Sequence, residues 1–303
     1  MEHRATIADI DRQFGIAGVA SVLPGNGGLP KVVVSTPHAN SEMYLHGGHV
    51  TSWAPAELGE ILYLSPNSRW QDGRAIRGGI PICFPWFGDK RDEPEAPAHG
   101  FVRTAPWELE AISVIGDDVA VSMFIENREG SSTSWPSAFH LACRVTFGVQ
   151  LKQQLIVTNT GSSSFQFEEA LHTYFLVGQA ESAYVLGLDG ADFLDKTDGY
   201  SQKIKSGDIR FIAETDRIYL DTQNDVTLID PAIMRRITLS KNNSSTTVVW
   251  NPWEKGAQSL VDLGEGQWKR MICIETSNVG RSAIQIAPGQ VHTMTATIRV
   301  AAL

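Results

Sequence analysis

An all-β fold, a single large antiparallel β-sandwich, is the architecture that the sequence predicts. Apolar and polar residues alternate with a period of two over long stretches, as they do in strands that bury one face. Turn residues interrupt these stretches at short intervals, no helical stripe competes with them, and no repeat of about 20–50 residues indicates a propeller. No linker rich in Pro, Gly or Ser divides the chain, so we expect one domain over residues 1–303.

Composition limits the classes of function. The 303 residues are 42% hydrophobic and 19% charged, which is typical of a globular protein. A net charge of −9 argues against nucleic acid or an anionic membrane as a partner, and any anionic ligand needs local cations. No apolar run approaches the roughly 20 residues of a membrane helix. The first residues, MEHRATIADIDRQFG, carry no basic-then-apolar signal segment, so a soluble, cytoplasmic protein is expected.

The strands of the N-terminal half are predicted in order along the chain. The Gly-rich segment 25–31 precedes a strand rather than opening a helix, so it does not predict a phosphate-binding loop. Segment 119–127 alternates, and segment 144–159 does so most clearly, which indicates an antiparallel strand pair or one long bent strand. The apolar residues that share one parity in this segment are Val145, Phe147, Val149, Leu151, Leu155 and Val157.

In the C-terminal half, segment 164–175 predicts another strand, and the apolar segment 270–275 predicts a strand that ends at a carboxylate. The last strand alternates Met294, Ala296, Ile298 and Val300 with Thr293, Thr295, Thr297 and Arg299. Turn signals between strands are Gly116-Asp117-Asp118, Asn159-Thr160-Gly161, Asp189-Gly190 and Lys241-Asn242-Asn243. The three cysteines, Cys83, Cys143 and Cys273, are far apart and predict reduced, partly buried thiols rather than disulfides or a zinc site.

Two ionisable residues interrupt apolar strands and are therefore candidates for chemistry. His172 shares its parity with Tyr174 and lies opposite Leu171 and Phe175, so it points away from the main core onto a polar face. Glu275 ends the strand 270–275. The alternative is that His172 is structural and Glu275 is an exposed residue at a strand end.

Two loops carry cations. Segment 74–88, RAIRGGIPICFPWFG, reads as a rigid irregular loop that places arginines beside flat apolar surface, and segment 98–103 adds His99 and Arg103. Each arginine alone is typical of a protein surface. Two such loops close in sequence, in an acidic protein, favour an anion pocket.

These segments resemble the hexose-6-phosphate mutarotases, also called glucose-6-phosphate 1-epimerases, of the galactose mutarotase-like (aldose 1-epimerase) superfamily. The resemblance spans about residues 60 to 280 and rests on AIRGGIPICFPWFG, AHGFVR, EEALHTYFLVG, ETDRIYL, VVWNPW and MICIET. It implies a galactose mutarotase-like supersandwich with a concave sugar-binding face.

The resemblance also implies roles for individual residues. His172 and Glu275 match the catalytic His and Glu of the family. Arg77, His99 and Arg103 lie in motifs whose arginines contact the substrate and its phosphate, and Asp216 matches an Asp that contacts the sugar. Some members carry a substrate-contacting Gln just before His-Gly-Phe, where this chain has Ala98, so that contact is not carried over.

Interconversion of anomers requires a proton delivered to the ring oxygen and another removed from the C1 hydroxyl. Imidazole, with an ordinary pKa of about 6.5, can donate at neutral pH, and a carboxylate, at about 4.3, can accept. We therefore expect His172 as general acid and Glu275 as general base, with no metal or other cofactor and a small hexose phosphate as the partner. Two alternatives remain: an aldose 1-epimerase acting on unphosphorylated sugars, and a non-catalytic carbohydrate-binding module. The sequence does not indicate an oligomeric state.

Overall fold

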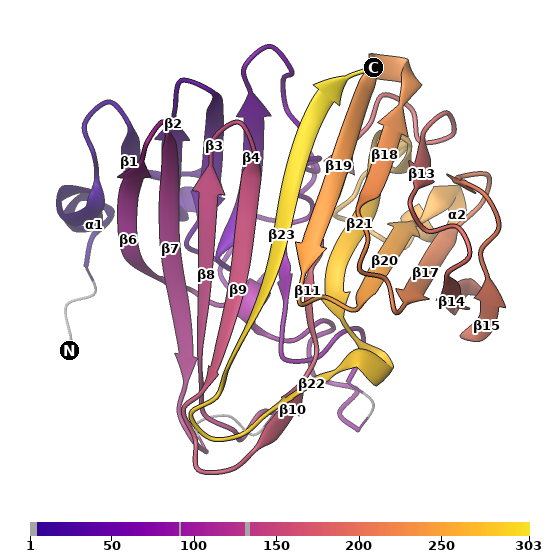
Figure 1. Ribbon diagram of the computed structural model, residues 1–303. Coiled ribbons are helices and arrows are strands. Elements are labelled where there is room, and N and C mark those ends of the chain that lie inside the picture. Colours follow the sequence, from indigo (N-terminus) through magenta and orange to yellow (C-terminus); the bar gives the residue numbers. More distant parts are fainter. Residues whose placement is uncertain (1–4, 91, 131–133) are drawn as a thin grey trace.

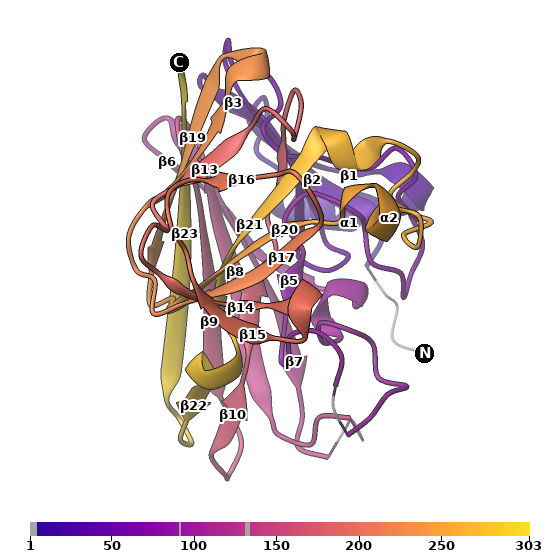
Figure 2. The ribbon, with the colours of Figure 1, turned by 90° about the vertical axis from the view of Figure 1, so that its right-hand side faces the viewer.

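Two layers of β-strands form the body of the protein (Figure 1, Figure 2). The structure is a computed structural model that describes residues 5–90, 92–130 and 134–303. One layer is a nine-stranded sheet, and the other contains an eight-stranded sheet. The pairings that build the sheets are antiparallel, which confirms the predicted all-β fold.

In spatial order, the nine-stranded sheet contains β16 (Ile209–Arg210), β13 (Tyr184–Leu186), β18 (Val226–Asp230), β19 (Arg235–Asn242), β23 (Val291–Ala302), β9 (Leu151–Asn159), β8 (Phe139–Phe147), β7 (Asp118–Asn127) and β6 (Glu108–Ile115). The eight-stranded sheet contains β15 (Ser201–Ile204), β14 (Asp192–Asp195), β17 (Thr215–Leu220), β20 (Thr246–Asn251), β21 (Met271–Asn278), β11 (Glu169–Leu171) and β5 (Ile82–Cys83), with β12 (Tyr174–Leu176) also paired to β21.

A four-stranded sheet and a two-stranded ribbon complete the strands. The sheet contains β1 (Ala20–Pro24), β2 (Pro30–Ser35), β3 (Ala39–Tyr44) and β4 (His49–Pro55), and the ribbon contains β10 (Phe165–Phe167) and β22 (Ile284–Ile286). The α-helices are α1 (Ile7–Phe14) and α2 (Trp253–Ala257). The short 3-10 helices are η1 (Asn26–Gly28), η2 (Val102–Thr104), η3 (Lys196–Asp198), η4 (Pro231–Ile233), η5 (Gln267–Arg270) and η6 (Gly280–Ser282).

The alternating segments form strands as predicted. Segment 144–159 is the pair β8 and β9, in which Leu151, Leu155 and Val157 are fully buried. Val149, which shares their parity, lies in the turn between the strands and is 61% exposed. In β23 the predicted apolar set turns inward, with Met294, Ala296 and Ile298 buried.

Two strand predictions were wrong in detail. Segment 164–175 is divided into β10, β11 and β12, because the chain leaves the sheet at 168 and again at 172–173. Glu275 does not end its strand, because β21 continues through three polar residues to Asn278, all of them buried. Interior hydrogen bonds hold Ser277 and Asn278, so polarity did not mark the end of the strand.

The helix α1 was not predicted, because eight residues are too few for a clear periodic stripe. A capping box closes its N-terminus: Thr6 accepts from the Asp9 amide, and Asp9 accepts from the Thr6 amide. Ile7, Ile10 and Phe14 pack against the main core.

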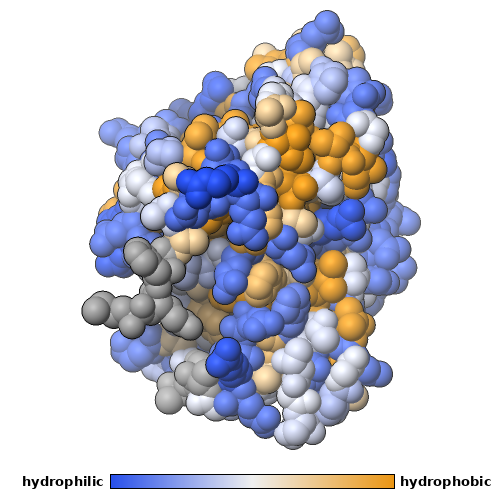
Figure 3. All heavy atoms as spheres, turned by 90° about the vertical axis from the view of Figure 1, so that its left-hand side faces the viewer, coloured by the Kyte–Doolittle hydropathy of each residue, from blue (hydrophilic) through white to orange (hydrophobic). Residues whose placement is uncertain are grey.

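The face of the protein that lies on the left in Figure 1 is mostly hydrophilic, with smaller hydrophobic patches (Figure 3). The first four residues of the segment examined for a signal lie outside the described residues.

The main core lies between the layers. It contains inward residues of the eight-stranded sheet, such as Ile272 and Ile274, together with Leu155 and Ile298 of the other sheet. Cys83, Cys143 and Cys273 are free and buried. Among the described residues, no helix is long and apolar enough to cross a membrane.

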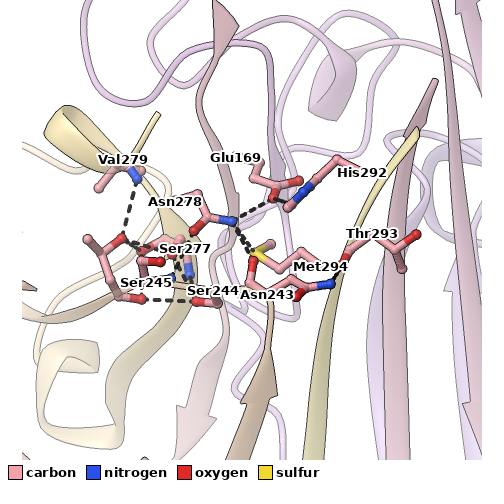
Figure 4. A network of polar contacts seen from close by, with 11 residues as sticks. Glu169, Asn243, Ser244, Ser245, Ser277, Asn278, Val279, His292, Thr293 and Met294 are labelled. Carbon is pink, nitrogen blue, oxygen red and sulfur yellow. Dashed lines mark hydrogen bonds and ion pairs between the residues drawn. The ribbon is translucent and has the colours of Figure 1, made fainter. Parts of the chain in front are cut away.

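A buried polar network joins β11, β21 and β23 (Figure 4). The side chain of Glu169, fully buried on β11, accepts hydrogen bonds from Asn278 Nδ2 and His292 Nε2, both at 2.8 Å. Asn278 also donates to the Asn243 carbonyl and accepts from the Ser245 amide. The network therefore fixes the end of β21 against both layers.

Candidate active site

The candidate site occupies the face of the eight-stranded sheet that points away from the main core. Successive side chains of a strand point to opposite faces, so Ile274 and Thr276 face the core while Glu275 faces outward. A cavity of about 290 Å³ opens on this outer face. Its lining consists of Arg77, Phe87, Ala98, His99, Arg103, His172, Lys196, Asp216, Val248, Trp250, Leu260 and Glu275. The cavity thus brings together all six residues that the sequence nominated.

The break between β11 and β12 places His172 beside Glu275. Leu171 pairs with Thr276 and Tyr174 pairs with Cys273, so the two interrupting residues lie opposite 274 and 275. The backbone amide of His172 leaves the ladder and donates to the Pro81 carbonyl at 3.0 Å. His172 and Glu275 therefore occupy cross-strand positions, and Nε2 lies 3.3 Å from Oε1.

Aromatic rings hold the His172 imidazole in place. The ring stacks on Tyr174 with centroids 4.8 Å apart and 14° between the planes. Trp250 and His99 meet it edge to face at 5.8 and 5.7 Å. His172 points away from the core onto a polar face, as predicted, and it is buried in the wall of the open cavity, since it is only 7% exposed.

Burial shifts both pKa values of the pair toward neutral side chains. It lowers the pKa of His172 well below its ordinary value, and the positive charges of Arg103 and Arg77 lower it further. Burial also raises the pKa of Glu275 well above its ordinary value, and the nearby Asp216 carboxylate adds to the effect. Both shifts favour the uncharged forms, which are neutral imidazole and protonated carboxyl, over the charged forms.

The two arginines have different partners. Arg77 donates to the Tyr174 hydroxyl at 2.9 Å, and its Nε and terminal nitrogen lie 3.2 and 3.1 Å from Asp262. Tyr174 and Asp262 raise the pKa of Arg77 and keep it charged despite its burial. Arg103 donates to the Ala98 carbonyl at 2.7 Å, and within the described part of the chain its buried Nε has no hydrogen-bond partner. Of the two arginines, Arg103 thus keeps more of its N–H donors for a ligand.

Asp216 forms an ion pair that the sequence did not predict. Its Oδ2 lies 2.7 Å from Nζ of Lys196, the first residue of η3. Burial raises the pKa of Asp216 above its ordinary value. Burial alone would lower the pKa of Lys196, but the Asp216 carboxylate outweighs it and raises that pKa. No periodic pattern marks Lys196, because it lies in a single turn after a short strand.

His99 lies against His172 and Phe87 at the wall of the cavity. Its Nδ1 accepts from the Gly88 amide at 3.3 Å. Burial, followed by the charge of Arg103, holds the pKa of His99 well below its ordinary value. It is therefore a neutral residue that shapes the wall and leaves Nε2 for a ligand.

The remaining residues of the lining, which the sequence did not nominate as site residues, are aromatic or aliphatic: Phe87, Trp250, Ala98, Val248 and Leu260. Trp250 lies within the motif 248–253 that supported the resemblance, whereas Asp262 gave no signal. Within residues 5–90, 92–130 and 134–303, no group of three or more His, Cys, Asp or Glu side chains is arranged to hold a metal ion. The chemistry that the lining offers is proton transfer by a buried His and Glu, next to cations.

Comparisons with known proteins show the family to which the chain belongs. The family described as aldose 1-epimerase matches residues 30–299. A protein of Cenchrus ciliaris named "Putative glucose-6-phosphate 1-epimerase" is 33% identical over 279 residues, which cover 87% of this chain and 82% of that protein. A protein of Escherichia coli K12 with the same name is 34% identical over 250 residues, covering 82% and 83%. A crystal structure described as a putative mutarotase from Salmonella typhimurium matches with a TM-score of 0.89 and 30% identity over 96% of each chain.

Proposed function

The chain belongs to the aldose 1-epimerase family and is a mutarotase, and from this premise we propose that its substrate is a hexose 6-phosphate, glucose 6-phosphate first. We further propose that His172 and Glu275 are its acid and base. The observation that carries the proposal is the buried pair with 3.3 Å between Nε2 and Oε1, in a cavity that also contains Arg103 and Arg77.

The reaction opens and recloses the sugar ring. His172 donates a proton to O5 while Glu275 removes the proton from the C1 hydroxyl, and the C1–O5 bond breaks to leave an aldehyde. Rotation about C1–C2 presents the other face of the aldehyde. Glu275 then returns a proton to the aldehyde oxygen, His172 takes the proton back from O5, and the bond reforms with inverted configuration at C1.

The shifted pKa values fit the middle of this cycle. Neutral His172 and protonated Glu275 are the states that accompany the open-chain aldehyde, and burial favours these states. A bound phosphate dianion offsets the charges of Arg103 and Arg77, so it raises the pKa of His172 toward the donating form. His172 and Glu275 together hold one proton throughout the cycle. That proton is on His172 when the sugar ring is closed and on Glu275 when the ring is open.

The test is exchange between the C1 protons of the two anomers, measured by NMR at equilibrium. We expect the protein to accelerate exchange in glucose 6-phosphate, and His172→Asn and Glu275→Gln each to lose about 10²-fold or more of that acceleration. His140→Asn, on β8 of the other sheet, is the control and should retain it.

Three outcomes would contradict the proposal. Exchange at the parent rate in both variants would remove His172 and Glu275 from the mechanism. Equal acceleration of glucose and glucose 6-phosphate would favour the unphosphorylated aldoses. Binding of the sugar phosphate without acceleration would favour a carbohydrate-binding module.

A further inference from the structure

The strands that carry the site residues follow one another across the eight-stranded sheet (Figure 1). From one edge inward, Lys196 follows β14, Asp216 lies on β17, Trp250 on β20 and Glu275 on β21. His172 comes next, directly after β11. Neighbouring strands are about 4.8 Å apart, so this row is long enough for a sugar to contact several of its members at once.

The two ends of the row differ in charge. At the His172 end, Arg77 is balanced by Asp262, but the partner that the described residues give Arg103 is an uncharged carbonyl, which leaves a positive charge. At the other end, Lys196 and Asp216 neutralise each other at 2.7 Å. A phosphate dianion is therefore favoured at the His172 end.

This difference orients the substrate if the protein acts on a hexose 6-phosphate, as proposed above. The phosphate is carried by C6, which is bonded to C5, the neighbour of O5. A phosphate at the arginine end thus brings O5 to His172 and the C1 hydroxyl to Glu275. C2, on the other side of C1 from O5, then points along the row toward Asp216 and Lys196.

We propose that Lys196 and Asp216 together recognise the C2 hydroxyl of the sugar, which makes Lys196 a specificity-determining residue. The ammonium donates to O2, and the Asp216 carboxylate accepts the hydroxyl proton. Both side chains are mostly buried, at 23% and 19% exposed, so their hydrogen bonds are poorly replaced by water. The ammonium also lies 5.8 Å from the centre of the Phe87 ring, which holds it at the cavity wall.

The experiment compares glucose 6-phosphate, 2-deoxyglucose 6-phosphate and glucose by NMR exchange. A charged hydrogen bond corresponds to roughly a 10- to 100-fold change in the specificity constant. We expect Lys196→Met to lose about that factor on glucose 6-phosphate and to change by less than about threefold on the 2-deoxy sugar. Asp216→Asn, which preserves the shape of the side chain, should show the same dependence on the C2 hydroxyl.

Lys152→Met, at an exposed lysine on β9 of the other sheet, is the matched control and should leave all three substrates unaffected. Equal losses on glucose 6-phosphate and the 2-deoxy sugar in both site variants would overturn the inference. A narrowed gap between glucose 6-phosphate and glucose in Lys196→Met would also overturn it, because Lys196 would then bind the phosphate. If the unsubstituted protein fails to accelerate anomer exchange in glucose 6-phosphate, the proposed function fails instead, and this is known before any variant is made.

Discussion

At the scale of single residues, Glu275 is a buried carboxyl group without hydrogen-bond donors. It is 1% exposed, and among the residues that the structure describes neither carboxyl oxygen has a hydrogen-bond partner, although His172 lies within ion-pair distance. Buried carboxylates are normally satisfied by several donors. The missing donors leave the oxygens of Glu275 available to a ligand, and they make its ionised form costly in the folded protein.

This cost predicts a pH-dependent gain of stability in Glu275→Gln. Because the folded pKa is raised, the folded wild type holds the proton that the unfolded chain releases above about pH 4.5, and it loses stability as pH rises through that window. Glutamine has no proton to lose. The melting temperature of the variant should match the wild type near pH 4 and exceed it increasingly as pH rises through that window, by roughly 2 °C for each unit by which the pKa is raised.

Differential scanning calorimetry at several pH values measures this gain. Glu126→Gln, at an exposed position of β7, should show no such trend. A difference in melting temperature between Glu275→Gln and wild type that stays constant from pH 4 to pH 8 would contradict a raised pKa of Glu275.

The arginines give a second prediction at this scale. Arg103→Ala should lower the specificity constant for glucose 6-phosphate by about 10- to 100-fold, and for glucose by much less, because Arg103 has an unpaired buried Nε. Arg77→Ala should act in the same direction, and it should also disturb Tyr174 beneath His172. Arg236→Ala, exposed on β19, is the control.

Kinetics on both sugars decide between phosphate recognition and a structural role for the arginines. Equal losses on glucose and glucose 6-phosphate would mean that Arg103 and Arg77 shape the loops without contacting the phosphate.

At the scale of elements, the register of β11 against β21 sets the distance between His172 and Glu275. The pair Glu169–Asn278 lies at one end of this register, and their side chains are also hydrogen-bonded (Figure 4). The Glu169 carboxylate also binds His292 of β23. The nine-stranded sheet is therefore joined to β21, the strand that carries Glu275.

Asn278→Ala should therefore destabilise the protein. It removes a donor from a carboxylate that is fully buried and whose second oxygen is already unpartnered. We expect the free energy of unfolding in urea to fall by about 2–4 kcal/mol. Lys152→Ala, on the exposed side of β9, should stay within about 0.5 kcal/mol of wild type. A change in Asn278→Ala as small as in this control would show that the network adds little to stability.

The sequence predicts an element well when one face is apolar and the other polar. This was so for β7, β8, β9 and β23. Prediction failed where tertiary contacts override the alternation, as at residues 172–173. There the chain leaves the strand ladder, and the His172 amide donates to the Pro81 carbonyl, which places the His172 side chain in the cavity. It also failed at the end of β21, because buried Ser277 and Asn278 are satisfied by partners far away in the sequence.

At the scale of the whole molecule, the eight-stranded sheet has two functions. Its inner face supplies Ile272 and Ile274 to the core, and its outer face supplies the cavity. Motifs carrying His172, Glu275 and the arginines could be recognised because each lies in a distinctive local sequence. Lys196 and Asp262 could not, because only the folding of distant segments makes them neighbours of Asp216 and Arg77.

The position of β21 also determines which segments can change their flexibility when a ligand binds. All eight of its residues are buried, and it pairs with β20 on one side and with β11 and β12 on the other. Backbone amides in such a strand exchange with deuterium only when the whole fold opens. We expect β21 to take up deuterium slowly and equally with or without glucose 6-phosphate, while η3 at the edge of the sheet becomes slower when the sugar binds. Mass spectrometry of peptides from both segments measures this, and ligand-induced protection confined to β21 would contradict it. We therefore expect the strand that carries Glu275 to be rigid before the substrate binds, and the loss of conformational entropy on binding to occur at the edge that carries Lys196.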